Sequence, residues 1–291
     1  YLSLAESFAG NMRDLAIYNL CKKDLSKTYI HMLGGAGMKE ILSGKGWQKN
    51  MNAGFIKKLA GVIVEGPINY ESFKRVIPED KIHIVPNFAE DFLFVSDEEI
   101  ETKFQTTHPI QLLYLSNLIP GKGYNELADA YLKLTEEEQQ QINISFVGGF
   151  ENEESEKGFL EKINVSLGFK YLGKFIDGDE KRKLYCQSHV FCLPTYYPFE
   201  GQPISILEVY ATGCVVITSN HSGIPFIFKD NENGFMVEKK SVPSLVDALK
   251  KLISKKDSLK EIAFHNRNEA LEKYRTSIYQ QKVIDIFNKK L

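Results

Sequence analysis

Residues 198–213 read PFEGQPISILEVYATG, and the rest of the chain can be placed around this stretch. It combines a short loop that carries Glu200 with a helical segment that carries Glu208. We expect the helix to span residues 203–212, because Pro203 suits the first helical position and Gly213 suits the left-handed residue beyond the end. A helix begins with free N–H groups, so the loop beside Glu200 is predicted to bind an anion, most simply a phosphate.

Apolar runs on both sides of this stretch predict a parallel sheet. Residues 189–194 and 214–218 are short and apolar, as buried parallel strands are, and residues 61–65, 110–115 and 142–149 are further strand candidates. Segments with helical periodicity alternate with these runs, which favours an α/β fold. A chain of 291 residues is long enough for two such domains.

Composition narrows the classes of function. The formal net charge of −2 provides no general basic field, so we expect no nucleic-acid partner. The four cysteines form no C-x-x-C pair, and no apolar run is long enough to cross a bilayer, so we expect a cytoplasmic protein. The chain begins at Tyr1 inside an apolar segment, from which we expect that its start is missing.

The spacing of the two glutamates resembles the E-x(7)-E motif of retaining glycosyltransferases of family 4, which have the GT-B fold. The resemblance implies that Glu200 lies near the donor sugar as the catalytic carboxylate and that Glu208 binds the nucleotide ribose. It also implies that the intervening backbone holds the sugar and diphosphate, which makes donor-binding residues of Gly201, Gln202, Pro203, Ile204 and Ser205. The plainer alternative is a loop carboxylate and a solvated helix residue, but Glu208 stands in a mostly apolar helix.

Two further segments of the second half resemble donor-binding motifs of the same family. Residues 116–123 resemble G-R-L-x-x-x-K-G; Lys122 matches the lysine that neutralises the diphosphate, whereas Asn117 replaces the arginine. Residues 169–175 resemble the segment that meets the nucleotide base, and we count Lys174 there as donor-binding. Residues 221–225 and 231–237 resemble G-G-x-P-E followed by N-G-x-L-V, with Phe226 in place of the glutamate.

The first half gives weaker signals. Residues 85–87, Val-Pro-Asn, resemble the element that ends the first domain of the family. Family members often carry a histidine before a glycine near the donor sugar, which makes His31, Gly34 and Gly35 sugar-side candidates. The second histidine of that pattern is Leu33 here, so His31 can equally be a hydrogen-bonded strand residue.

The Asp177-Gly178-Asp179 sequence invites interpretation as a metal site. We prefer to interpret Asp179 as the N-cap of a following helix, because aspartate and glycine are expected at such a turn. No other His/Cys/Asp cluster has metal-ligand spacing, so we expect neither a metal nor a cofactor.

The resemblance therefore implies an α/β protein of the GT-B class, with two Rossmann-like parallel-sheet domains facing across a cleft and the first of them incomplete. We place a partial acceptor-side domain at 1–107, a nucleotide-sugar-binding domain at 108–275 and a returning terminal helix at 276–291. The expected activity is metal-independent, retaining sugar transfer from a nucleotide-diphosphate sugar to a glycan or lipid-linked acceptor in bacterial surface polysaccharide synthesis. Such an acceptor leaves room for peripheral contact with the inner face of the membrane.

Three other functions have to be weighed. The replacements at Asn117 and Phe226 leave open a non-catalytic module that binds sugar nucleotides, and a sugar-nucleotide epimerase would share the GT-B architecture. A nicotinamide-dependent oxidoreductase is disfavoured, because no G-x-G-x-x-G sequence follows a predicted strand.

Overall fold

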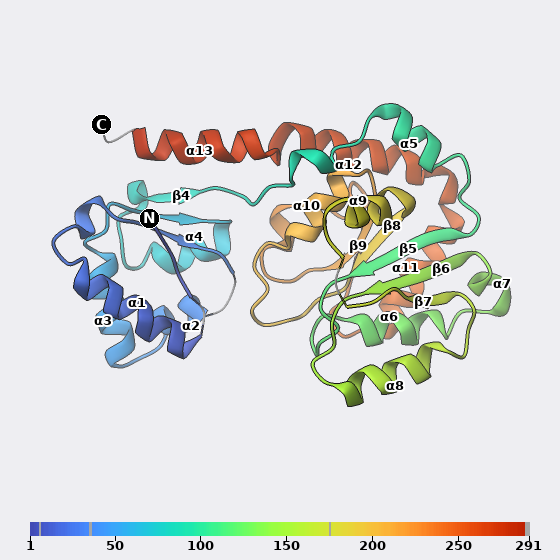
Figure 1. Cartoon of the computed structure of the whole chain (residues 1–291), viewed down its shortest axis with the longest axis horizontal. Coiled ribbons are helices and arrows are strands. Elements are labelled where there is room, and N and C mark those ends of the chain that lie inside the picture. Colours follow the sequence, from blue (N-terminus) through green and yellow to red (C-terminus); the bar gives the residue numbers. More distant parts are fainter. Residues whose placement is uncertain (6, 35–36, 175, 289–291) are drawn as a thin grey trace.

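Two parallel sheets organise the chain in the computed structural model (Figure 1). The structure describes residues 1–5, 7–34, 37–174 and 176–288. Every strand pairing within these residues is parallel, which confirms the α/β prediction. No helix in the described part of the chain has the length and apolar character needed to span a membrane.

The first sheet has the strand order β1-β2-β3-β4, and its two faces are covered by different helices. Val62 and Val64 belong to the cluster that contains residues of the early helices, whereas Ile63 packs with Ile286 of the terminal helix α13. In Figure 1, α13 runs from the second half of the molecule across to this sheet. The strands are β1 (Leu2–Ser3), β2 (Tyr29–Met32), β3 (Gly61–Val64) and β4 (Ile82–Ile84); the helices are α1 (Phe8–Leu20), α2 (Gly37–Ser43), α3 (Trp47–Ile56) and α4 (Pro67–Phe73), with short 3-10 turns at Leu25–Lys27, Glu79–Lys81 and Asp91–Leu93.

The second sheet has the strand order β10-β9-β8-β5-β6-β7. Its strands are β5 (Ile110–Leu115), β6 (Ile142–Val147), β7 (Phe169–Tyr171), β8 (Val190–Leu193), β9 (Val215–Ser219) and β10 (Gly234–Val237). The helices that follow β4 along the chain are α5 (Asp97–Lys103), α6 (Tyr124–Tyr131), α7 (Glu136–Gln139), α8 (Glu153–Ile163), α9 (Gly178–Gln187), α10 (Ile204–Ala211), α11 (Val242–Ser254), α12 (Leu259–Lys273) and the returning helix α13 (Thr276–Asn288), with 3-10 turns at Ile224–Phe226 and Lys256–Ser258. One large apolar cluster forms the core around this sheet.

The strand order of the second sheet reverses direction between β5 and β8. From β5 the chain proceeds outward to β6 and β7, and it then returns to β8 on the other side of β5. Loops that leave the carboxyl ends of two such strands diverge and leave a crevice, where open parallel sheets bind their ligands. Lys122 follows β5 and Glu200 follows β8, so the topology brings the two predicted site loops together.

Three sequence predictions near the site differ from the structure by one or two residues. Helix α10 begins at Ile204, and Pro203 is its N-cap in an extended conformation rather than its first helical residue. The N-cap position of α9 is held by Asp177, so Asp179 lies in the first turn instead of capping the helix. Strand β3 ends at Val64, which leaves Glu65 in the loop beyond it. Gly213 is left-handed at φ +65°, as predicted.

Candidate functional site

The loops after β5 and β8 pack tightly on each other at the point where the strand order reverses. The Tyr196 N–H donates to the Gly121 carbonyl over 2.6 Å. Gly123 has φ +82°, and a Cβ there would lie only 2.5 Å from the Pro194 carbonyl oxygen. Only glycine satisfies both conditions, so the glycines around Lys122 allow the two loops to meet.

Glu200 and Lys122 form a buried ion pair within this crevice. Lys122 Nζ lies 2.8 Å from Glu200 Oε2, and the two side chains are only 14% and 10% exposed. The Thr195 hydroxyl donates to the same oxygen over 2.9 Å, and the Lys122 ammonium lies 5.0 Å from the centroid of the Tyr197 ring. These contacts compensate the burial of two charges and hold the carboxylate in one orientation.

The start of helix α10 lies next to this pair. The first N–H groups of any helix lack intrahelical acceptors, so those of Ile204 and Ser205 lie where the sequence predicts an anion site. The Gln202 N–H, which was predicted to bind the donor, instead donates to Glu65 Oε2 over 2.9 Å. Gly201 lies against the backbone of Gly34 from the first half of the chain.

A second group of predicted residues lines a cavity of about 300 Å³ beside Glu208 of α10. Asn117, Lys174 and Glu208 all contribute to its lining, together with Asp177 and Lys181. The side chain of Lys174 is 67% exposed and lies 3.2 Å from a carboxylate oxygen of Glu156. The structure thus brings together three residues that the sequence assigned to the donor from three separate segments.

Glu208 is held at this cavity by two residues of α9. Its oxygens accept from Lys181 Nζ over 2.9 Å and from the Tyr185 hydroxyl over 2.8 Å. Burial lowers the pKa of Lys181, but the hydrogen bonds and charges of Glu208 and Asp177 outweigh it, so the net shift of that pKa is upward. Burial, reinforced by the charge of Glu208, raises the pKa of the Tyr185 hydroxyl well above its ordinary value.

Sequence reasoning missed Lys181 and Tyr185. The available signal was their spacing, because Asp177, Lys181 and Tyr185 recur every four residues and therefore share one face of α9. Asp177 pairs with Lys181 over 3.3 Å. Within the described residues no group of three or more His, Cys, Asp or Glu side chains is arranged to hold a metal ion.

The sugar-side candidates of the first half separate in the structure. His31 lies in β2 and is fully buried, its Nδ1 hydrogen-bonded to the Tyr1 hydroxyl and its ring stacked near Tyr279 at 6.5 Å between centroids. Burial lowers the pKa of His31 to about 4. This placement favours the strand-residue alternative. Gly34 does lie at the site, because it contacts Gly201 and its carbonyl accepts from Asn69 Nδ2 over 2.7 Å; Gly35 falls outside the described residues.

A polar groove opens beside the Glu200 loop. It has a volume of about 310 Å³ and runs between helices α2 and α4 of the first half and the turn at His221 and Ser222 of the second. The Ser222 hydroxyl donates to the Glu200 carbonyl, which holds this turn against the Glu200 loop. We call it the α2–α4 groove; its lining residues are Lys39, Glu40, Ser43, Ile68, Pro198, His221 and Ser222.

Comparison with known proteins identifies the class to which this fold and site belong. Residues 96–269 match the family described as "Glycosyl transferases group 1", and the chain belongs to that family. It is 25% identical over 221 residues to the uncharacterized glycosyltransferase MJ1607 of Methanocaldococcus jannaschii, covering 72% of this chain and 54% of that protein. It is 28% identical over 181 residues to the capsular polysaccharide biosynthesis glycosyltransferase CapM of Staphylococcus aureus, covering 60% and 45%. The chain spans about half the length of these relatives.

Solved structures confirm the GT-B prediction. The Anabaena protein HepE in complex with UDP superimposes with a TM-score of 0.77 at 15% identity, covering 96% of this chain and 77% of HepE. HepE has also been solved with UDP-glucose, and that structure superimposes with a TM-score of 0.74 at 15% identity over 98% of this chain and 78% of that one. At these identities the likeness establishes the fold alone.

Proposed function

We propose that this chain transfers a sugar from a nucleotide-diphosphate sugar to an acceptor hydroxyl with retention of anomeric configuration. The observation that carries the proposal is the cavity of about 300 Å³ that Asn117, Lys174 and Glu208 line together. Family membership and the UDP complexes of HepE support a nucleotide donor. In this assignment Glu208 accepts hydrogen bonds from the ribose, as the family resemblance implies.

We assign the reacting centre to the amino-terminal end of α10, beside Glu200, whereas Glu208 lies toward the carboxyl-terminal end of that helix. The bond from the anomeric carbon to the diphosphate oxygen breaks, and positive charge develops on the sugar while negative charge develops on the leaving group. Glu200 stabilises the first charge, and Lys122 with the amides at Ile204 and Ser205 stabilises the second. The acceptor hydroxyl then bonds to the anomeric carbon on the face the diphosphate leaves, and its proton passes to a phosphate oxygen. A covalent route through Glu200 is the alternative.

The α2–α4 groove is the proposed entry for the acceptor. It begins at the turn that contacts the Glu200 loop and continues along two helices of the first half. CapM and the amylovoran biosynthesis glycosyltransferase AmsK of Erwinia amylovora carry polysaccharide biosynthesis in their names. We therefore propose a glycan or lipid-linked acceptor of bacterial surface polysaccharide synthesis, handled at the inner face of the membrane.

We propose that the reaction uses neither a metal nor a cofactor. The charge on the departing diphosphate is met by Lys122 and by the start of α10. Asp177 is committed to Lys181 over 3.3 Å rather than to a second carboxylate.

A binding screen followed by turnover tests the proposal. UDP-, GDP- and ADP-sugars are titrated into the protein by calorimetry, and the donor that binds is incubated with and without glycan and lipid-linked acceptors. We expect one base to be preferred and sugar to be transferred with the anomeric configuration kept. Binding without turnover would make the chain a non-catalytic module, and conversion of the donor without an acceptor into its sugar epimer would make it an epimerase.

A further inference from the structure

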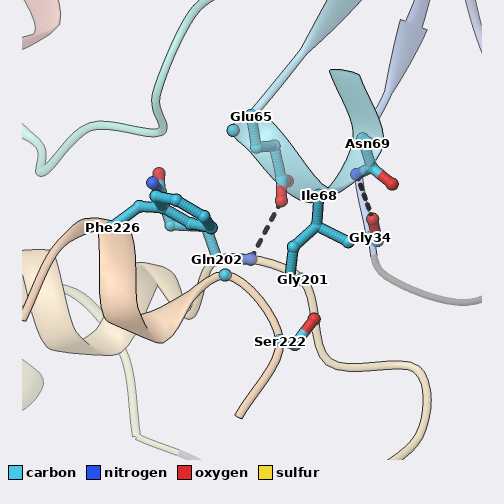
Figure 2. A pocket seen from close by; sticks show the side chains of 10 residues that line it. Gly34, Glu65, Ile68, Asn69, Gly201, Gln202, Ser222 and Phe226 are labelled. Carbon is cyan, nitrogen blue, oxygen red and sulfur yellow. Dashed lines mark hydrogen bonds between the residues drawn. The ribbon is translucent and has the colours of Figure 1, made fainter. Parts of the chain in front are cut away.

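Glu65 joins the first sheet to the donor-binding loop of the second. It is the first residue beyond β3, and it is only 6% exposed. Glu65 Oε2 accepts from the Gln202 N–H over 2.9 Å, and Glu65 Oε1 accepts from Asn87 Nδ2 over 3.0 Å. Figure 2 shows the carboxylate of Glu65 pointing toward the backbone N–H of Gln202, to which a dashed line joins it.

Asn87 and Gln202 complete the connection with two more hydrogen bonds. The Asn87 N–H donates to Gln202 Oε1 over 2.7 Å, and Asn87 Nδ2 donates to the Gln202 carbonyl over 3.0 Å. Both residues are buried, at 7% and 5% exposed. Three of these four hydrogen bonds therefore join the two halves, and the fourth, between Asn87 and Glu65, links two segments of the first half. We call Glu65, Asn87 and Gln202 the latch.

The latch closes the space between the two halves at this point. A Cβ on Gly201 would lie 2.6 Å from Glu65 Oε2 and 2.8 Å from Gly34 Cα, so the two backbones touch. The remaining cavity has a volume of about 10 Å³, and Ile68, Asn69 and Phe226 also line it (Figure 2). That volume accommodates about one water molecule, which is far less than a sugar ring.

We propose that Glu65 is a positioning residue of the donor site: its carboxylate holds the Gln202 N–H and the closed cleft in the donor-free protein, and the donor displaces it. The proposal rests on the proposed function, because the displacing ligand is a nucleotide-diphosphate sugar. A carboxylate and a phosphate compete for the same kind of backbone donor, so the N–H that Glu65 occupies becomes available to the donor only when the latch opens. Donor binding therefore includes the cost of opening the latch.

Removing the latch should strengthen donor binding. A hydrogen bond to a charged group that must break on binding lowers the affinity by about tenfold or more. We expect Glu65→Ala to lower the donor Kd by about that factor. We also expect kcat to fall, because without Glu65 the two halves no longer hold a single relative orientation. Gln202→Ala, which keeps the backbone N–H but removes the bond from Asn87, should shift the donor Kd in the same direction by less.

The shape of the donor-free protein gives an independent readout. One spin label is placed on exposed Cys21 of the first half and the other on Leu167→Cys in the second, where Leu167 is fully exposed; partly exposed Cys186 is replaced by Ser. We expect a single narrow distance distribution in the wild type and longer, broader distances in Glu65→Ala. Glu71→Ala removes an exposed carboxylate from neighbouring α4 and should behave as the wild type.

The outcomes separate the latch from other roles. Weaker or unchanged donor binding in Glu65→Ala, or label distances identical to the wild type, would overturn the latch. A wild type that binds no nucleotide-sugar contradicts the proposed function, and the donor-free distances then still decide whether Glu65 holds the halves together. Where Glu65→Ala unfolds, Glu65→Gln keeps the shape but removes the charge, and the same two measurements apply to it.

Discussion

Replacing Glu200 by Gln should lower turnover by roughly a hundredfold or more with little loss of donor affinity. The carboxylate is oriented by Lys122 at 2.8 Å and by Thr195 at 2.9 Å, and glutamine keeps an acceptor for the Thr195 hydroxyl while removing the charge. A full charge about 4 Å away contributes about 4 kcal/mol at an effective dielectric constant of about 20. A sugar that carries about two-thirds of a positive charge in the transition state would lose about 2.7 kcal/mol, or about a hundredfold in rate.

The partner of Glu200 determines the sign of the change in donor affinity. In Glu200→Gln, Lys122 loses the carboxylate that neutralises it, yet its side chain remains only 14% exposed. Its charge then acts more fully on the donor diphosphate, so the donor Kd should stay constant or fall. A double-mutant cycle with Lys122→Met should give a coupling energy of about 0.5–3 kcal/mol, as expected for residues in direct contact.

Calorimetric titration of the donor alongside initial-rate kinetics measures both effects. Glu232→Gln is the control, because that carboxylate is 53% exposed and pairs with Lys229 away from the crevice. Turnover near the wild-type rate would refute the electrostatic role of Glu200. A loss confined to donor binding would instead make it an ordinary substrate-holding carboxylate.

Three further predictions follow from the same site and its surroundings. Glu208→Ala should weaken binding of the bare nucleoside diphosphate by about 1.5–3 kcal/mol, the range for hydrogen bonds to a charged group, and unchanged calorimetric affinity would count against the ribose assignment. Sugar transfer should continue in EDTA. An activity that is lost on chelation and returns only with added manganese or magnesium would instead make Asp177 or Asp179 a metal ligand. Because burial lowers the pKa of His31 from 6.5 to about 4, the unfolded chain takes up this proton first, and the free energy of unfolding should fall by up to about 3 kcal/mol as the pH drops from 6.5 to 4. Chemical denaturation between pH 4 and 6.5 should show that the free energy of unfolding depends less steeply on pH in His31→Asn than in the wild type. Equal slopes for the two proteins would contradict the lowered pKa of His31.

The parts of the site that the sequence revealed are those encoded locally. The run 189–194 predicted β8, and Gly213 marked the end of α10, because strand burial and left-handed turns depend on neighbouring residues. The order of the strands then placed Lys122 and Glu200 in one crevice. The pairing of their side chains was not predicted, since the family resemblance assigned Lys122 to the diphosphate rather than to Glu200.

The parts that sequence reasoning missed depend on contacts between distant segments. Lys181 was overlooked because the Asp177-Gly178-Asp179 turn drew attention to metals and caps rather than to the face of the helix that follows. Its partner Glu208 lies 27 residues further along the chain, and neither periodicity nor composition joins the two. The structure joins them through hydrogen bonds from Lys181 and Tyr185 of α9 to Glu208 of α10.

Glu65 illustrates the limit of local reasoning. The sequence placed it at the end of a predicted strand, where a carboxylate before Gly66 and Pro67 resembles any polar loop residue. Its hydrogen-bond partner Gln202 is 137 residues away and belongs to the other sheet. Asn87, in turn, was noticed only as the last residue of a Val-Pro-Asn element, which marks a boundary between domains without indicating a role. The contacts of both side chains form only where the two halves meet at Gly34 and Gly201, so the proposed role of Glu65 can be inferred from the assembled structure and not from either half alone.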